Sequence, residues 1–478
     1  MGAAALLAGA ASSPAGAGSN EASVDTINVG VATLQEQYVD PILANQGGNL
    51  YPVKWAVGEH LLNLDLDAKF VPGLAVEWEV SDDDLTWTVH LREGVLMHDG
   101  SAFTANDVKT AIDRINVDDP VFSSYAPFKN RIAAVTVIDD LTVEIQTTVP
   151  YPNVLANAPA PIATAYFEEV GEEAFREHPI AAGPFMFDSQ VLNQSITLKR
   201  FDDFWDAERI PNFETLVLHI MPEESSRIAA LRSGQIDLAH GLSPAGVAQL
   251  EGVEGIRLIT TPSAALPMIY FQDLWYPEEA SPLQDARVRR ALLMAIDREG
   301  IVNSIYNGFG EVANNLVFPV TIGADPTLDV VPYDPDGARA LLEEAGASGM
   351  SITLNTYNAT TVIPDVQHLA EVIVSFWQAI GVDAQLNAVD PATYLPAVRG
   401  HEYRGGVILG MPGLQFAEPT EYNIFLSTGG AYSNLNDPAI NDLLAEMAMA
   451  VDPDVKLELA SEFARLAHEQ LWGLPLFY

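Results

Sequence analysis

The stretch that decides the fold reads TWTVHLREGV over residues 86–95 and HDGSAFTANDV over residues 98–108. Apolar and polar side chains alternate at its start, which is the period of a β-strand with one buried face. Trp87, Val89 and Leu91 form the apolar face. This first part therefore predicts a half-buried strand.

The second part of the stretch predicts a turn and a helix. Asp99-Gly100 is a turn signal, because glycine adopts positive φ without the steric cost that other residues meet. Thr104 is expected to cap a helix that starts near Ala105, and Asp107, three residues after the cap, completes part of a capping box. Strand, turn and capped helix form a structural module with no chemistry of its own.

The same local reasoning predicts alternating strands and helices along the rest of the chain. Val135–Ile138 and Leu141–Ile145 are expected to form a hairpin around the turn Asp139-Asp140. Asp285 and Asp334 are expected N-caps, and Gly234 an expected C-terminal glycine. Further strands are expected at 27–31, 216–220, 236–239 and 382–389, and helices near 105–115, 223–233, 286–296, 335–345 and 366–379. This alternation predicts an α/β or α+β fold.

Length and charge limit the function. The chain has 478 residues, enough for two to four domains, and 48% of them are hydrophobic, as in globular proteins. Asp and Glu outnumber Lys and Arg 65 to 23, which gives a formal net charge of −42. Because this charge repels phosphates, nucleic acids and anionic membrane surfaces are expected to be poor partners. A solvated acidic surface suited to salty surroundings explains the charge, and a surface that collects cations remains the alternative.

Two features of the sequence indicate the cellular compartment: the absence of cysteine and the composition of the first residues. No cysteine means no disulfide, no thiolate metal site and no lipid anchor on a cysteine. Residues 1–20 are rich in Ala and Gly and carry no charge, so residues 1–23 are expected to be a signal-peptide remnant or a disordered leader. No later run of about 18 apolar residues exists. We therefore expect a protein that is soluble outside the cytoplasm, in the periplasm.

Five segments, in this order along the chain, carry a family resemblance: FVPGLA at 70–75 with Trp78, HDGSAFTANDV at 98–108, GPF at 183–185, LRSGQID at 231–237, and DARVRRAL at 285–292 with AIDR at 295–298. Each alone is a cap, a turn or a core pattern that any α/β protein can use. Together they resemble the family 5 extracytoplasmic solute-binding proteins of ABC importers, which include binders of dipeptides, oligopeptides and nickel.

The resemblance implies a two-lobe α/β binder with the type II periplasmic-binding-protein fold. Lobe one would comprise residues 24–50, 183–262 and 466–478, with an extra subdomain at 51–182, and lobe two residues 263–465. The lobes would close on a ligand about a hinge. The implied partners are a small solute and the permease and ATPase subunits of an ABC importer, and we expect a monomer that does not bind nucleic acid.

Enzyme motifs are missing from the sequence. It contains no phosphate-binding loop, no nucleophile elbow and no HExxH zinc motif, and its nine histidines are dispersed. We therefore predict no catalytic residues, no metal site and no cofactor. A secreted hydrolase, with a nucleophile and a base brought together by folding, remains the alternative from another class.

In the family that this chain resembles, the ligand lies between the lobes. Candidate ligand-binding residues are therefore expected in loops at strand ends. The candidates are Thr33, Gln35 and Tyr38 after the first strand, Tyr270, Gln272 and Trp275 after the first strand of lobe two, and Met411, Gln415 and Phe416. For each aromatic among them, plain core packing is an equally good interpretation.

The residue at position 415 affects which class of solute is expected to bind. Peptide binders of the family commonly show D-Y-x-[DE]-P at this place, where the Asp pairs with the peptide's amino terminus. Alignment on Glu418-Pro419 puts Gln415 at the Asp position and Phe416 at the Tyr. An amide cannot neutralise an ammonium, and a buried unpaired charge is costly. The sequence thus argues for a solute other than an unmodified peptide, with a peptide-specific binder as the alternative.

Overall fold

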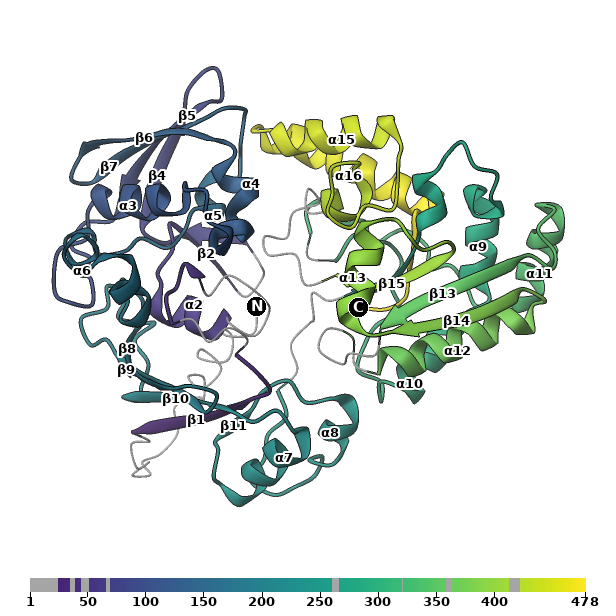
Figure 1. Ribbon diagram of the computed structural model, residues 1–478, viewed down its shortest axis with the longest axis horizontal. Helices are drawn as coiled ribbons and strands as arrows, with labels where there is room; N and C mark the ends of the chain where they lie inside the picture. Colours follow the sequence, from purple (N-terminus) through teal and green to yellow (C-terminus); the bar gives the residue numbers. More distant parts are fainter. Residues whose placement is uncertain are drawn as a thin grey trace. The chain divides into compact units, whose positions relative to one another are not determined.

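The computed structural model describes residues 25–34, 39–43, 51–65, 69–259, 266–319, 321–357, 363, 365–411 and 422–478. The chain divides into two compact units, Met1–Ile259 and Thr260–Tyr478. In Figure 1 the colours run from purple to teal through unit one and from teal to yellow through unit two.

Unit one contains a five-stranded sheet with the order β11-β1-β10-β9-β8. Strand β1 lies parallel to β10 and β11, whereas β9 is antiparallel to both of its neighbours. The strands are β1 (Thr26–Val31), β8 (Phe185–Val191), β9 (Ser195–Arg200), β10 (Thr215–Ile220) and β11 (Leu238–Ala239). Apolar side chains of β1, β8, β9 and β10 form one core cluster, so this sheet joins segments that are more than 150 residues apart, as Val29 and Phe185 are.

A second sheet of unit one has the order β4-β5-β7-β6, beside the small sheet β2-β3. In β5 the side chains of Trp87, Val89 and Leu91 are 5%, 0% and 4% exposed, which confirms the predicted buried face. The strands are β2 (Leu62–Leu64), β3 (Phe70–Pro72), β4 (Ala75–Val80), β5 (Thr86–Leu91), β6 (Ile132–Asp139) and β7 (Thr142–Thr147). All of them lie within the segment 51–182 that was expected as an extra subdomain.

The predicted capped helix is present as α3 (Ala105–Ile115), which packs on β6 and β7 (Figure 1). The backbone N–H of Thr104 donates to the Asp107 carboxylate at 2.7 Å, which is half of the predicted capping box. Gly100 in the preceding turn has φ +82°, as the turn prediction requires.

The predicted hairpin is present, but its turn is shifted by one residue. Asp139 still pairs with Thr142, so the two turn residues are Asp140 and Leu141. The Asp139 carboxylate accepts the backbone N–H of Leu141 at 2.9 Å. This local side-chain bond closes the turn one residue later than the strand pattern predicted.

In unit one, α2 packs on β8, α3 on β6 and β7, and α7 on β11. Helix α7 ends at the predicted glycine, since Gly234 follows it in the left-handed region with φ +71°. The remaining helices are α2 (Tyr51–Val57), the 3-10 segment η2 (Pro120–Tyr125), α4 (Ala126–Lys129), α5 (Val154–Asn157), α6 (Thr164–Glu177), α7 (Glu224–Ser233) and α8 (Pro244–Ala248).

Unit two contains one five-stranded sheet with the order β14-β13-β15-β12-β16. Strands β13, β14 and β15 are parallel, and β12 runs antiparallel to both β15 and β16. The strands are β12 (Leu266–Phe271), β13 (Ser351–Tyr357), β14 (Asp383–Val389), β15 (Gly406–Met411) and β16 (Gly473–Pro475).

The helices predicted for the second half of the chain are present with their caps. Asp285 accepts the N–H of Arg287 at the start of α9, and Asp334 accepts that of Gly337 at the start of α11. The helical segments are η3 (Gln272–Trp275), η4 (Pro282–Gln284), α9 (Ala286–Met294), α10 (Arg298–Ser304), α11 (Pro335–Glu344), α12 (Val366–Ala379), α13 (Pro391–Arg399), α14 (Asn423–Leu426), α15 (Pro438–Met449) and α16 (Pro453–Gln470).

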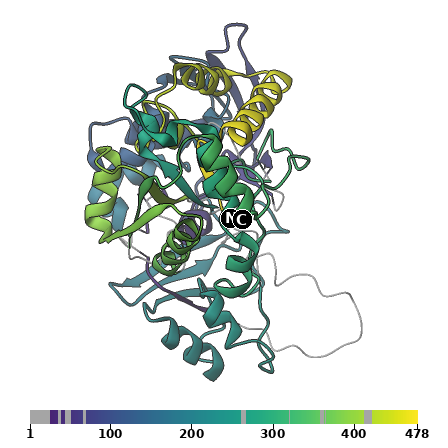
Figure 2. The ribbon, with the colours of Figure 1, turned by 90° about the vertical axis from the view of Figure 1, so that its right-hand side faces the viewer.

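Helix α12 packs along β13 and β14, and the green strands lie among helices in Figure 2. Its Trp377 is fully buried, and the indole N–H donates to the Leu292 carbonyl of α9 at 3.0 Å. One hydrogen bond thus ties two helices to a common core.

The C-terminal segment differs from the expectation that placed residues 466–478 in lobe one. Strand β16 pairs with β12, and Phe477 packs on Tyr306 with ring centroids 4.6 Å apart, so the segment belongs to unit two. The segment is apolar and its strand is short. Such a pattern indicates burial but carries no information about which sheet edge it joins.

Candidate functional site

The parallel strands of unit two bring their carboxyl ends to one edge of its sheet. Tyr357, Val389 and Met411 end β13, β14 and β15, and the register pairs Met411 with Leu266 at the start of β12. In open α/β sheets ligands bind outside the carboxyl ends of the strands. Met411 lies at this edge, and the candidates Gln415 and Phe416 lie outside the described residues.

Tyr270 lies inside the core of unit two. It is fully buried, and its ring stacks on Phe425 with centroids 5.3 Å apart and 2° between the planes. Burial raises the pKa of the Tyr270 hydroxyl. The Tyr270 side chain is therefore packed in the core of unit two.

Gln272 is also fully buried, and both the NH₂ group and the oxygen of its amide are hydrogen-bonded. The NH₂ group donates to the Val398 carbonyl at 2.7 Å, and the amide oxygen accepts the backbone N–H of Tyr403 at 3.1 Å. The side chain therefore braces the end of β12 against the last turn of α13 and the segment that leads into β15.

Trp275 is the last residue of η3 and stacks on His401, with ring centroids 3.9 Å apart. Both residues lie near the amino end of β15, because Phe271 at the end of β12 pairs with Gly406. Five residues of strand separate this end from Met411, which is roughly 17 Å. The structure thus places Gln272 and Trp275 at one end of the sheet and Met411 at the other, and does not bring them together.

The carboxyl edge of β13 carries polar residues that sequence reasoning missed. Asn355 is buried, donates to the Gly406 carbonyl at 3.0 Å and accepts from Asn387 of β14 at 2.9 Å. Thr356 is fully buried, and its hydroxyl has no partner among the described residues. Asparagine and threonine next to each other near the end of a strand were the available signal, since a buried polar group costs free energy unless it is paired.

In unit one the parallel strands β1, β10 and β11 end at a common edge. Thr33 is half-buried and follows β1 at this edge, while Gln35 and Tyr38 lie outside the described residues.

Arg227, which sequence reasoning also missed, holds this edge together. It is 3% exposed, and its guanidinium donates to the carbonyls of Met221 and Pro222 after β10 and of Gly241 after β11, at 2.6, 2.9 and 3.2 Å. Burial, with a smaller effect of Arg227, lowers the pKa of the neighbouring His240. An arginine one turn into the helix after a parallel strand was the available signal.

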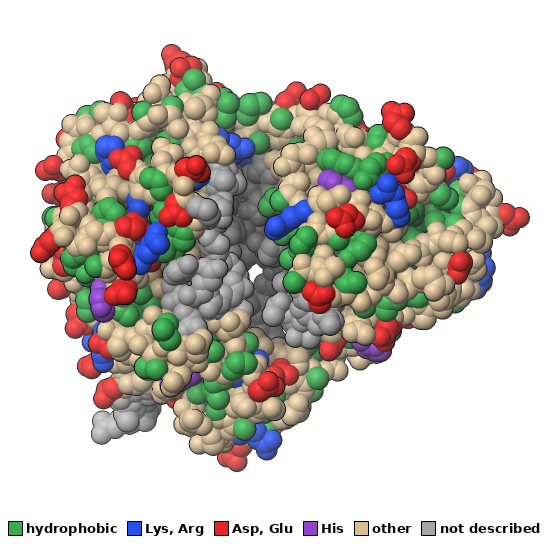
Figure 3. Space-filling view, viewed as in Figure 1, with side chains coloured by type: hydrophobic (Ala, Val, Ile, Leu, Met, Phe, Trp, Pro, Cys, Tyr) green, Lys and Arg blue, Asp and Glu red, His purple; other side chains and the backbone are tan. Residues whose placement is uncertain are grey.

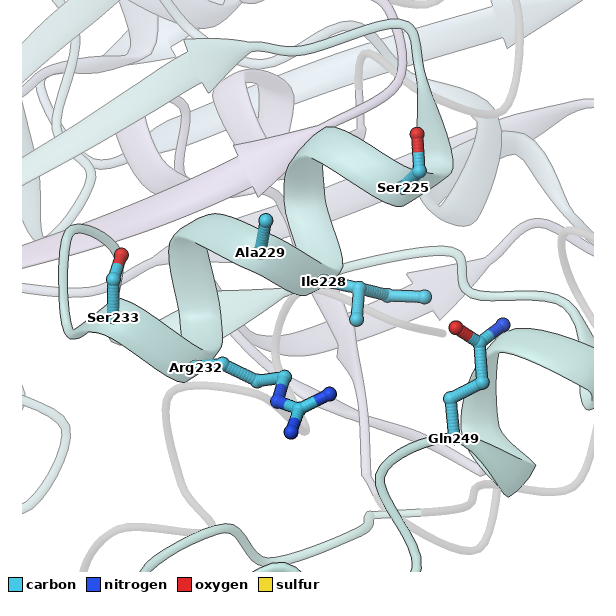
Figure 4. Close-up of a pocket in the computed structure, with 6 residues that line it drawn as sticks. All are labelled: Ser225, Ile228, Ala229, Arg232, Ser233 and Gln249. Carbon is cyan, nitrogen blue, oxygen red and sulfur yellow. The ribbon is translucent and has the colours of Figure 1, made fainter.

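Described residues of unit one line cavities at two places. One, of 410 Å³, is lined by Ser225, Ile228, Ala229, Arg232, Ser233 and Gln249 between α7 and the end of α8. Figure 4 shows Arg232 and Gln249 extending toward the space beside Ile228. The other, of 510 Å³, lies between α3 and α6 and is lined in part by Arg114 and Glu172.

The described residues contain no cluster of three or more His, Asp or Glu side chains placed to hold a metal ion. None of their helices is both long enough and apolar enough to cross a membrane.

Comparison with known proteins gives a consistent set of relatives. The family described as bacterial extracellular solute-binding proteins, family 5, middle region, matches residues 69–433. The dipeptide-binding protein of Escherichia coli is 30% identical over 437 residues, which cover 84% of this chain and 79% of that protein. The glutathione-binding protein of Escherichia coli O1:K1 is 31% identical over 346 residues, covering 71% and 65%. The solved structure of HbpA2 from Haemophilus parasuis matches with a TM-score of 0.82 at 24% identity, covering 95% and 94%.

Proposed function

The chain belongs to family 5 of the bacterial extracellular solute-binding proteins, and on this premise we propose that it captures a small solute outside the cytoplasm. The observation that carries the proposal is the extent of the family match, since residues 69–433 include most of both compact units. The likeness to HbpA2 confirms the predicted two-lobe α/β fold of periplasmic binding proteins. The family is one of binding proteins that serve ABC importers.

Capture would be stoichiometric. The two units would act as the lobes, and the carboxyl edges of their sheets would supply the loops that contact the solute. The predicted residues at these edges are Thr33, Gln35 and Tyr38 in unit one and Met411, Gln415 and Phe416 in unit two. A ligand that binds only the closed state shifts the population toward it and stabilises the fold.

The solute class has two candidates. Gln415 in place of the acid of peptide binders favours a solute that presents a neutral or weakly polar group there. A short peptide or peptide derivative is the second candidate, and the relatives that bind dipeptides and glutathione favour it.

One experiment separates these candidates. Native mass spectrometry of the gently purified protein identifies any solute that stays bound. Thermal unfolding is then followed with di- and tripeptides, their N-acetylated forms, glutathione and a sugar panel. A rise in melting temperature with a ligand that is recovered intact supports solute capture. Consumption of the ligand during incubation would instead favour the hydrolase alternative.

The partner is tested separately. The protein has no nucleotide-binding loop in its sequence, so the ATPase subunits of the importer would supply the energy. With the cognate importer in proteoliposomes, the liganded protein should stimulate ATP hydrolysis more than the ligand-free protein. Equal stimulation by both forms would argue against delivery of a captured solute.

A further inference from the structure

A buried aspartate marks the segment that follows the first candidate ligand loop. Val39, Asp40, Ile42 and Leu43 are each at most 2% exposed. One oxygen of the Asp40 carboxylate accepts the backbone N–H of Ile42 at 2.9 Å, and the other accepts from the Arg114 guanidinium at 2.5 Å. The charge that holds this segment therefore comes from a helix 74 residues away in sequence.

Arg114 is in the last turn of α3 and contacts a third segment as well. Its Nε and one Nη donate to the two oxygens of Glu172 on α6, both at 2.8 Å. Phe122, Phe167 and Phe175 surround the guanidinium, with ring centroids 5.7, 5.4 and 4.9 Å from its carbon. A single guanidinium thus joins residues 39–43 to the two helices α3 and α6.

The two carboxylates differ in their access to solvent. The side chains of Arg114 and Asp40 are 2% and 0% exposed, whereas that of Glu172 is 37% exposed and also pairs with Arg176 at 2.6 Å. Glu172 lines the 510 Å³ cavity, and Asp40 does not. Burial by itself would lower the pKa of Arg114, but attraction to Asp40 and Glu172 outweighs it and raises that pKa. The guanidinium therefore stays charged, and its partner Asp40 is fully buried.

The position of Asp40 connects this contact to solute capture. Strand β1 ends at Val31, and the candidate residue Thr33 lies between Val31 and Asp40 in the sequence. We infer that Arg114 is a positioning residue for solute capture, which fixes through Asp40 the buried segment 39–43 that follows Thr33 along the chain. This inference rests on the proposed function and gives the extra subdomain a role in it.

The test uses a variant that restores the packing while removing the anchor. Loss of one partner of a buried ion pair leaves an uncompensated charge, whereas apolar replacement of both partners is often neutral for stability. Arg114→Met alone should lower the melting temperature, and Arg114→Met with Asp40→Leu should recover most of it. Glu172→Gln is the matched control. It removes the other carboxylate that pairs with Arg114 and leaves the Asp40–Arg114 pair in place.

Two readouts follow in the stable double variant. Hydrogen exchange of the backbone amides in residues 39–43 should accelerate about tenfold or more, because the hydrogen-bonded anchor is gone. Affinity for two probes, glutathione and L-alanyl-L-alanine, should fall about tenfold, while Glu172→Gln changes either readout by less than about twofold. Arg114→Lys, which keeps the charge but not the forked geometry, should fall between these limits.

Some results would overturn the inference. A double variant with wild-type exchange in residues 39–43 and wild-type probe affinity would show that the pair only contributes stability. If the unaltered protein binds neither probe, the peptide candidate under the proposed function fails. The exchange measurement still tests whether Arg114 holds residues 39–43 in place through Asp40. Unchanged exchange in the double variant would then reject the anchor by itself.

Discussion

The imidazole of His401 lies flat against the indole of Trp275, with ring centroids 3.9 Å apart and 9° between the ring planes. His401 Nε2 lies 2.8 Å from the Ser433 carbonyl oxygen, so the stack is also fixed from the other side. The stack sits at the amino end of β15, opposite the carboxyl edge where solutes bind to such sheets. Trp275 is partly buried and packs on a side chain of its own unit, so we expect it to stabilise unit two rather than to contact the solute.

Trp275→Ala should lower stability and leave solute affinity nearly unchanged. Removing a stacked aromatic side chain costs about 3 kcal/mol in the free energy of unfolding. Urea unfolding followed by circular dichroism measures the loss, and calorimetric titration with the co-purified solute should give an affinity within about twofold of the unaltered protein. Trp275→Phe, which keeps a ring on His401, is the control. A large affinity loss without a stability loss would place Trp275 in the binding site instead.

Gln272→Leu should destabilise unit two without a compensating gain. Two backbone groups, the Val398 carbonyl and the Tyr403 N–H, lose their partner inside a sealed core, and each costs about 1–3 kcal/mol when left unsatisfied. Gln249→Leu is the matched control, because that amide is exposed beside the cavity between α7 and α8 (Figure 4). Equal stability of the two variants in urea would contradict the role given to Gln272.

His98 should make the protein sensitive to acid. Burial lowers the pKa of His98 to about 4, despite its hydrogen bond to the Gly183 carbonyl and the nearby Asp99. Its Nδ1 accepts the N–H of Ala181 at 3.4 Å, so the folded state holds the neutral ring. Because the unfolded chain takes up a proton near pH 6.5, this stabilisation is complete above pH 6.5 and is lost as the pH falls toward 4.

The loss attributed to His98 is about 3 kcal/mol over that range. His98→Gln should reduce the slope of unfolding free energy against pH by about one proton between pH 6.5 and 4. His368→Gln, which changes an exposed histidine of α12, is the matched control. Identical slopes for the unaltered protein and His98→Gln would reject the assignment.

Salt should stabilise the fold. Acidic side chains are spread over the visible face in Figure 3 and outnumber basic ones, in keeping with the net charge of −42. Because mobile ions screen their mutual repulsion, the melting temperature should rise from low to molar NaCl. NaCl and MgCl₂ compared at equal ionic strength separate the two interpretations of the charge. A rise already at millimolar Mg²⁺ would favour a cation-collecting surface over a solvated one.

Gln415→Asp should improve affinity for unmodified peptides and weaken affinity for the co-purified solute. A carboxylate neutralises an ammonium that the amide of Gln415 cannot, and the difference corresponds to about tenfold to a hundredfold in affinity. Calorimetric titration of both forms with a mixed di- and tripeptide pool measures it. Submicromolar peptide binding by the unaltered protein, dependent on a free amino terminus, would show that another acid fills this role.

Local patterns were sufficient for much of the fold. The alternation at Trp87, Val89 and Leu91, the cap at Thr104 and the helix Val366–Ala379 depend on neighbours within a few residues, which a sequence displays directly. The family, too, was predictable from the order of five short segments. The site was less predictable. Tyr270 lies near the end of β12 and Gln272 directly follows it, where ligand residues are expected, yet their environment comes from Phe425, Val398 and Tyr403 far along the chain.

The sequence alone established the α/β alternation, the capped helices, the acidic surface and the family. Only the tertiary structure decided that the C-terminal strand joins β12, that Trp275 lies at the far end of its sheet from Met411, and that Asp40 receives its charge partner from Arg114. The reason is physical. Caps, turns and buried faces arise from interactions a few residues apart, whereas a sheet edge or a buried ion pair joins distant segments, whose partners are selected by the packing of the whole unit.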